Sequence, residues 1–238
     1  MKKIRYQLII AMLFALITAP HAVANPTKKI RLAAPIFPPY IFQTNNKWDG
    51  VGYHTVNKIL NNANITYEII PVGNYGKALD ALIKGKVDGF FPATQNPVRD
   101  QHAQFSQPIL INRWVWYMPN SEQLTPDMAE FKQQRFVSTP FKSNTHVWLS
   151  THGYKVKGTL EIDNLPNMLL KKRLDAVLIS QLVFETSAKN HKIPMHNFKQ
   201  IVHSEKGFGI YLSKATLKNK PELLKRINQS IVELDNNH

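Results

Sequence analysis

Residues 85–108 read GKVDGFFPATQNPVRDQHAQFSQP, and this stretch decides the fold of the chain. Before it, residues 75–84 carry apolar side chains at helical spacing, and Gly85 can adopt the left-handed conformation that ends a helix. Residues 87–91 then form a short apolar run, which predicts a buried strand. A helix that leads into a buried strand is typical of an open α/β sheet.

Polar residues follow this predicted strand. Thr94, Gln95 and Asn96 come first, and Pro97 and Arg99 come next. In an open α/β sheet, ligands bind at the carboxyl ends of the strands. A guanidinium group is a fork of hydrogen-bond donors that suits a carboxylate or a phosphate. We therefore expect Arg99 to bind an anionic group of a ligand, with polar contacts from Thr94 and Asn96.

The segments GKVDGFFPAT, NPVR and FSQP resemble a recurrent pattern of the bacterial extracellular solute-binding proteins, family 3. These proteins serve ABC importers of amino acids and similar solutes. The usual Thr-x-x-Arg of the pattern begins with Asn96 in this chain. The resemblance implies an α/β fold of the type II periplasmic binding protein class: two lobes, each a mixed β-sheet flanked by helices, with the ligand in the cleft between them.

The first 24 residues have the composition of a secretory leader. Basic residues stand at positions 2, 3 and 5, an apolar run covers residues 8–19, and small residues precede the end at Ala24. This predicts a signal peptide over residues 1–24, cleaved after Ala24, and a periplasmic location. The alternative is an uncleaved membrane anchor, but a run of about a dozen apolar residues is short for a transmembrane helix, which needs about 20 residues.

Composition limits the other function classes. Removing the leader, which has three Lys or Arg and no acidic residue, lowers the formal charge from +14 to +11. A basic chain can bind nucleic acid, but the lysines are scattered, so we expect a solvated basic surface and no nucleic acid partner. The absence of cysteine excludes disulfides and thiolate chemistry. No hydrolase elbow, zinc motif or phosphate-binding loop occurs, so no catalytic residue, metal or cofactor is expected.

Two segments echo each other and suggest two lobes of similar topology. Residues 87–89 (Val-Asp-Gly) and 174–176 (Leu-Asp-Ala) each follow a predicted helix and open an apolar strand. Together with the resemblance, this echo predicts that lobe one comprises residues 25–114 and 204–238, and lobe two residues 115–203.

The resemblance also implies further ligand contacts. An aromatic residue after the first strand should stack on the ligand, a role open to Phe37 and Tyr40, although Tyr40 could equally fill the core. Tyr75 is a candidate wall of the cleft. Lobe two is expected to contribute Ser143, Asn144 and Thr145, which could instead cap the following helix.

Ser180 stands where the family's amino-acid binders usually place an aspartate for the ligand's ammonium group. Without that carboxylate, a buried ammonium group is costly. The prediction that the ligand is a standard α-amino acid is therefore weaker than the prediction of the fold. A carboxylate-bearing or neutral polar solute is an equal alternative.

The sequence thus predicts a monomeric periplasmic protein that captures a small polar or carboxylate-bearing, amino-acid-like solute for an inner-membrane ABC permease. Two alternatives remain. One is a secreted enzyme on the same fold, similar to cyclohexadienyl dehydratase, and the other is a sensor or interaction protein that has lost its ligand.

Overall fold

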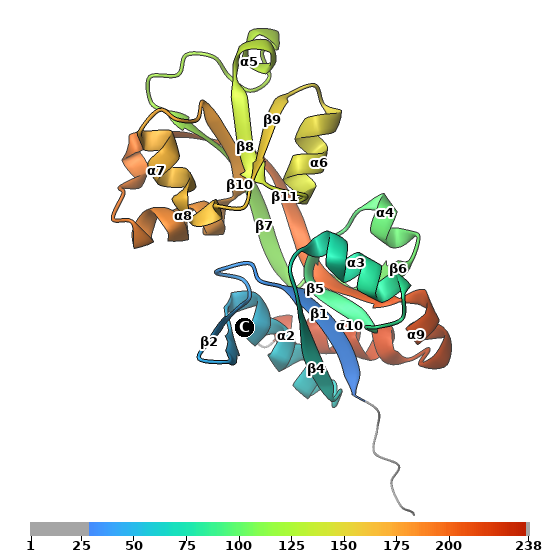
Figure 1. Cartoon of the computed structure of the whole chain (residues 1–238). Coiled ribbons are helices and arrows are strands. Elements are labelled where there is room, and N and C mark those ends of the chain that lie inside the picture. The colour runs from blue at the N-terminus through green and yellow to red at the C-terminus, as the bar shows by residue number, and fades with distance from the viewer. Residues whose placement is uncertain (1–28, 237–238) are drawn as a thin grey trace, which may run out of the picture.

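The computed structural model describes residues 29–236, so the predicted signal peptide and its cleavage after Ala24 lie outside the described residues. Two groups of helices and strands are joined by two long strands, β7 (Leu110–Pro119) and β11 (Phe198–Ser213) (Figure 1). We call the lower group in Figure 1 the first half and the upper group the second half. The predicted mixed α/β class is confirmed.

Each half contributes strands to one mixed sheet, whose order is β4-β1-β5-β11-β7-β10-β8-β9, with β6 paired to β11. The strands of the first half are β1 (Ile30–Pro35), β4 (Tyr67–Val72), β5 (Gly89–Thr94) and β6 (Ala103–Phe105), with the separate hairpin β2 (Phe42–Thr44) and β3 (Lys47–Asp49). Those of the second half are β8 (Phe136–Pro140), β9 (Lys155–Thr159) and β10 (Ala176–Ser180). Within each half the outer strands are parallel, whereas β7 and β11 run antiparallel to their neighbours.

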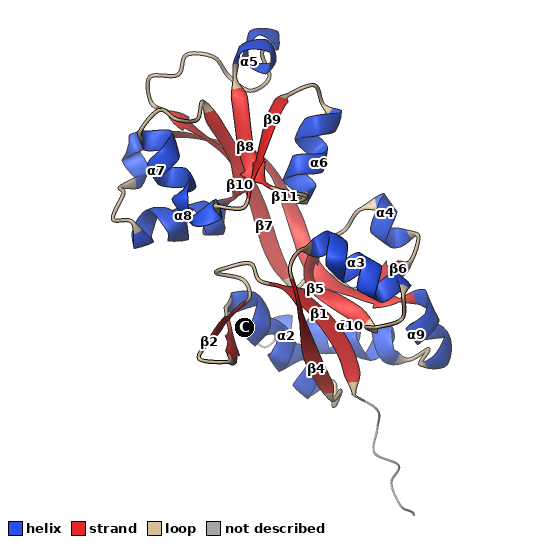
Figure 2. Cartoon of the chain, in the orientation of Figure 1, coloured by secondary structure: helices blue, strands red, loops and turns tan. Residues whose placement is uncertain are grey.

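Helices cover both faces of the sheet in each half (Figure 2). Those of the first half are α2 (Val51–Asn62), α3 (Tyr75–Ile83), α4 (Pro97–Asp100), α9 (Lys214–Asn219) and α10 (Leu223–Asp235). Those of the second half are α5 (Ala129–Gln134), α6 (Asn144–Thr151), α7 (Leu165–Leu170) and α8 (Gln181–Asn190), with short 3-10 turns at η1 (Ile162–Asn164) and η2 (Met195–Asn197).

Alternation along the strands divides the core into layers, because successive side chains point to opposite faces. In β5, Phe91 packs in the cluster that includes α2 and α10, while Phe90 packs on the other face with α3. In β7, Tyr117 packs against α7 and α8, and Trp116 against α5 and α6. Each half is therefore a sheet between two helical layers.

The connection between the halves lies where β7 and β11 leave one half for the other. Trp114 pairs with Ser204, and Arg113 pairs with Glu205. The pairing register shifts between Val202 and Ser204, which makes a β-bulge at His203. A bulge bends a strand and increases its twist, so the sheet changes direction at this crossing.

Two glycines of the opening stretch occupy positions that other residues would not fit, one because of its backbone conformation and one because of its neighbours. Gly85 has a φ of 66°, and its amide donates to the carbonyl of Leu82 at the end of α3, as the sequence predicts. A Cβ atom on Gly89 would collide with the backbone of Tyr211 on the neighbouring strand. The close approach of β5 and β11 thus requires glycine at this position.

Candidate functional site

A cavity of about 40 Å³ lies where the two halves meet. The carboxyl ends of β5, β8 and β10 reach it with Thr94, Pro140 and Ser180 respectively. Strand ends in an open α/β sheet are the usual location of a ligand site. Its lining residues are Phe37, Tyr75, Thr94, Arg99, Asn112, Trp114, Pro140, Ser143, Asn144, Thr145, Ile179, Ser180 and Phe208.

Arg99 is held in place by the short helix α4. The Asn96 side chain caps this helix and accepts a hydrogen bond from the Arg99 amide at 2.9 Å. Arg99 is 5% exposed, and its guanidinium donates to the Thr94 carbonyl oxygen at 2.6 Å and lies 5.0 Å from the centre of the Tyr75 ring. Burial lowers the pKa of Arg99 from its usual value, although the oxygens of Tyr75, Tyr211 and Asp100 act in the opposite direction. An arginine nevertheless keeps its charge in proteins.

The charge of Arg99 is not balanced by an ion pair. Among the described residues, no carboxylate lies within ion-pair distance of its guanidinium, and none of the lining side chains is acidic. The nearby Asp100 instead accepts hydrogen bonds from Tyr211 at 2.8 Å and Gln95 at 3.2 Å. The cavity therefore offers one buried positive charge with donor groups available to an anion.

Aromatic rings form one wall of the cavity. Phe37 stacks on Tyr40 with ring centres 5.6 Å apart and meets the edge of Tyr75 at 6.3 Å. Tyr40 is 3% exposed and lies behind this wall, where its hydroxyl hydrogen bonds to Ser180 at 3.0 Å and its ring meets Phe208. Phe37 thus faces the cavity, while Tyr40 supports it from the core.

The second half contributes the loop before α6. Ser143 caps the helix by accepting from the His146 amide at 3.1 Å, and it also hydrogen bonds to Thr145 at 2.7 Å. Asn144 accepts a hydrogen bond at 3.0 Å from the Asn96 side chain of the first half. The cap of α4 therefore contacts the first residue of α6 across the boundary between the halves.

Eight of the ten residues expected from the sequence line this cavity: Phe37, Tyr75, Thr94, Arg99, Ser143, Asn144, Thr145 and Ser180. The other two, Tyr40 and Asn96, lie behind it and contact lining residues through their side chains. Whether any of the ten binds a ligand remains a prediction.

Five lining residues were not among the sequence candidates, namely Asn112, Trp114, Pro140, Ile179 and Phe208. Asn112 is 4% exposed, and its side-chain oxygen has no hydrogen-bond partner among the described residues. A signal for it was present in the sequence, because it is a polar residue inside the apolar run of residues 109–118. Trp114 lies two residues further along the same strand, on the same face.

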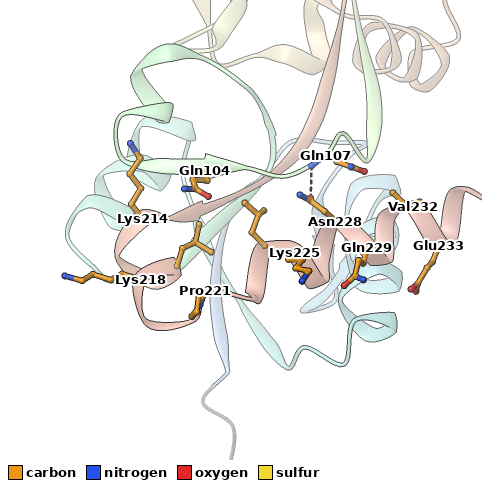
Figure 3. A pocket seen from close by; sticks show the side chains of 12 residues that line it. Gln104, Gln107, Lys214, Lys218, Pro221, Lys225, Asn228, Gln229, Val232 and Glu233 are labelled. Carbon is orange, nitrogen blue, oxygen red and sulfur yellow. Dashed lines mark hydrogen bonds between the residues drawn. The ribbon is translucent and has the colours of Figure 1, made fainter.

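A larger hollow, of about 890 Å³, lies on the surface of the first half beside α9 and α10 (Figure 3). The Gln107 amide donates to Asn228 at its rim, and Lys214, Lys218 and Lys225 line it. Its described lining residues include neither an aromatic side chain nor a residue of the second half. The cavity between the halves is therefore the better candidate for a small-molecule site, despite its smaller volume.

Two further searches covered residues 29–236. No helix in this range is long and apolar enough to span a membrane. The same residues contain no group of three or more His, Cys, Asp or Glu side chains placed to hold a metal ion.

Known structures share the fold over most of the chain. ArgBP from T. maritima, in a mutant form, has a TM-score of 0.69 and 19% identity, with 88% of this chain and 90% of that chain covered. The GluR0 ligand-binding core from Nostoc punctiforme, in complex with L-glutamate, has a TM-score of 0.72 and 21% identity, with coverages of 87% and 93%. At these identities the similarity establishes the fold alone.

A third structure connects the fold with an enzyme lineage. It is the ancestral amino acid-binding protein AncCDT-1, described as a precursor of cyclohexadienyl dehydratase. Its TM-score is 0.70 at 17% identity, with 87% of this chain and 89% of that chain covered.

Comparison with curated proteins gave no match. The family model for bacterial extracellular solute-binding proteins, family 3, matches residues 30–238, and the chain belongs to this family.

Proposed function

We propose that the protein is a monomeric periplasmic solute-binding protein that captures a small carboxylate-bearing, amino-acid-like solute in the cavity between its halves and delivers it to an inner-membrane ABC permease. Members of the family are typically extracellular or periplasmic binding proteins. One observation carries the choice of ligand: the buried Arg99 guanidinium faces the cavity with no carboxylate partner among the described residues. A ligand carboxylate would supply the missing charge.

The remaining contacts follow from the lining. Phe37 and Tyr75 would pack against the solute body, and Thr94 would contact its polar part. From the second half, Ser143, Asn144, Thr145 and Ser180 would complete the enclosure. Tyr40 and Asn96 would act through their neighbours, by orienting Ser180 and Asn144.

Binding would require the halves to move. A cavity of about 40 Å³ is far smaller than the roughly 300–1,000 Å³ of drug-sized ligand sites, so a solute would enter when the halves separate and would be enclosed when they close. The predicted lobe boundaries after residues 114 and 203 coincide with the crossing of β7 and β11 and its bulge. This coincidence supports the proposal that lobe one is 25–114 with 204–238, that lobe two is 115–203, and that the hinge lies at the crossing.

A binding role is favoured over a catalytic one by the chemistry of the lining. The described lining residues include no carboxyl, imidazole or amine side chain that could serve as a general acid or base. Incubation with prephenate or arogenate tests the enzymatic alternative, because a dehydratase would release an aromatic product. A protein that has lost its ligand would instead show no thermal shift with any solute in a broad screen.

The first prediction concerns Arg99. Replacing Arg99 with Met should lower the affinity for a carboxylate ligand by about 10- to 100-fold, because hydrogen bonds to a charged group contribute about 1.5–3 kcal/mol. A thermal-shift screen of amino acids, organic acids and polyamines identifies a ligand, and isothermal titration then compares the variants.

The matched control is Arg135→Met, since Arg135 pairs with Glu122 at 2.6 Å within the second half and does not line the cavity. Circular dichroism checks that both variants fold. Equal affinity of the Arg99 variant, the control and the unmodified protein would refute the proposed site.

A further inference from the structure

Asn112 presents a hydrogen-bond acceptor that the fold itself does not use. The residue is 4% exposed and lines the cavity, and its Oδ1 atom has no partner among the described residues. A buried acceptor without a donor destabilises the folded state, so such groups in folded proteins usually have a partner. Because Asn112 lines the cavity, a donor group of a bound ligand would lie close to this acceptor.

The strand direction supports this orientation. Side chains two residues apart in β7 share a face of the sheet, and Asn112 and Trp114 both line the cavity. Arg113, between them, points to the other face and pairs there with Glu205. The amide of Asn112 is therefore built into the cavity wall and not into the outer surface.

Several other polar groups in the lining already have partners within the protein. Ser180 hydrogen bonds to Tyr40, and Ser143 and Thr145 hydrogen bond to each other. Asn144 accepts its hydrogen bond from Asn96. The unpaired acceptor of Asn112 and the unpaired charge of Arg99 are thus two features of the cavity that call for complementary groups on a ligand.

The charge of the cavity limits what the second ligand group can be. An ammonium group would lose its hydration, would find no carboxylate among the lining side chains, and would share a small enclosed space with the Arg99 guanidinium. Like charges at short range in a medium of low dielectric repel strongly, and a buried charge without a partner is costly. A neutral hydroxyl or amide N–H can donate to Asn112 without either cost.

We propose that the cavity selects a small carboxylate whose second polar group is a neutral donor, a hydroxyl or an amide, and that Asn112 accepts a hydrogen bond from that donor. This inference rests on the proposed function, in which Arg99 binds the carboxylate. It assigns to Asn112 the discrimination between a hydroxy acid and an amino acid of the same carbon skeleton.

The test compares ligands that differ only in this group. One set is propionate, lactate and alanine, and a larger set is 3-phenylpropionate, 3-phenyllactate and phenylalanine. Isothermal titration should find the hydroxy acid of at least one set about tenfold tighter than the deoxy acid, because one well-placed hydrogen bond in a buried site contributes about this factor. The amino acid of that set should bind more weakly than the hydroxy acid.

Substitutions at Asn112 identify the residue responsible. In Asn112→Leu the hydroxy acid should no longer bind more tightly than the deoxy acid, while the deoxy acid keeps its affinity to within about threefold. The effects of removing the ligand hydroxyl and of removing the Asn112 amide should therefore be non-additive. Asn112→Asp keeps an acceptor, adds a negative charge and should raise the affinity for the amino acid relative to the hydroxy acid. The control is Tyr117→Phe, which removes another unpaired buried oxygen, on the same strand but outside the cavity. It should leave all affinities unchanged.

The outcomes separate the two proposals. If the acids bind but the amino acid binds as tightly as the hydroxy acid, the proposed function stands and this inference is wrong. If Asn112→Leu weakens all three ligands of a set equally, the selective role of Asn112 is wrong. If no carboxylate of either set binds, both proposals fail. The ligand comparison uses the unmodified protein and so does not depend on the folding of a variant.

Discussion

At the residue scale, two buried tyrosines differ in what their hydroxyl groups meet. Tyr117 stacks on Phe184 with ring centres 3.7 Å apart, but its hydroxyl has no hydrogen-bond partner among the described residues. Burial raises the pKa of Tyr117 well above its usual value. Tyr211 is buried to the same extent, yet its hydroxyl donates to Asp100 at 2.8 Å and accepts from the Asn96 amide at 3.0 Å.

Tyr117→Phe should therefore raise the free energy of unfolding by about 1 kcal/mol, since it removes a buried polar group that gains nothing on folding. Tyr211→Phe should lower it by about 1–3 kcal/mol, because the Asn96 amide and one oxygen of Asp100 lose their hydrogen-bond partner. Urea denaturation of the three proteins measures both changes. A loss of stability in the Tyr117 variant as large as that in the Tyr211 variant would contradict this account.

At the scale of elements, Asp88 and Asp175, the aspartates of the two similar segments, have the same structural role in the two halves. Asp88 precedes β5 and accepts hydrogen bonds from the backbone amide and the side chain of Arg31, in the neighbouring strand β1. Asp175 precedes β10 and accepts at 2.8 Å from the backbone amide of Phe136, in the neighbouring strand β8. The echo in the sequence thus marks how one strand is tied to the next, and not a ligand contact.

Asp88→Asn should lower the free energy of unfolding at pH 7 by about 2 kcal/mol, since hydrogen bonds to a charged group are lost. Burial raises the pKa of Asp88, but hydrogen bonds from Arg31 and its positive charge outweigh this and hold the pKa below its usual value of 3.8. A carboxyl group with a lowered pKa in the folded state stabilises the protein above its unfolded-state pKa. That contribution is lost as the pH falls through the lower folded-state value.

The difference between the unmodified protein and the Asp88 variant should therefore be constant from pH 7 to about 5 and should disappear in strong acid. Urea denaturation at several pH values follows it. Asp175→Asn is the comparison, and we expect a smaller loss because, within residues 29–236, no arginine lies within ion-pair distance of this carboxylate. A difference that is the same at every pH would show that the charge of Asp88 does not matter.

At the scale of the whole molecule, the halves touch through few polar contacts beside the hinge strands. Asn96 donates to Asn144 at 3.0 Å, and Tyr40 hydrogen bonds to Ser180 at 3.0 Å. Each of these bonds joins a residue of the first half to one of the second. The enclosed arrangement is therefore stabilised partly by bonds that separation of the halves would break.

Asn144→Ala should shift the molecule toward an open arrangement without unfolding α6, because Ser143 and not Asn144 caps that helix. Loss of one hydrogen bond of about 1 kcal/mol should change the ratio of closed to open molecules by about fivefold. Small-angle X-ray scattering should then record a larger radius of gyration for the ligand-free variant. Asn61→Ala is the matched control, since it removes an Asn–Asn hydrogen bond within α2. Identical scattering of both variants and the unmodified protein would show that this contact does not hold the halves together.

Local patterns were sufficient to predict the family and the fold class, and both predictions are confirmed. The helix stop at Gly85 and the apolar strand after it depend on neighbours along the chain, so they can be recognised in a short stretch. The boundary of that strand was less accurate: the sequence predicts residues 87–91, whereas β5 runs from Gly89 to Thr94. The apolar pattern does not reveal where pairing with β1 and β11 begins and ends.

The cavity depends on contacts between residues far apart in the chain. Its arginine could be predicted from the sequence, because Arg99 follows a strand end by five residues. Asn112 was missed, since in a linear reading it is one polar residue in an apolar strand. Only the antiparallel pairing of β7 with β11 and the meeting of the two halves decide that its amide faces Arg99's cavity and not solvent. The sequence by itself determined the elements and the charged group, whereas the tertiary structure decided which polar atoms remain unpaired, because burial and hydrogen-bond partners depend on contacts between distant segments.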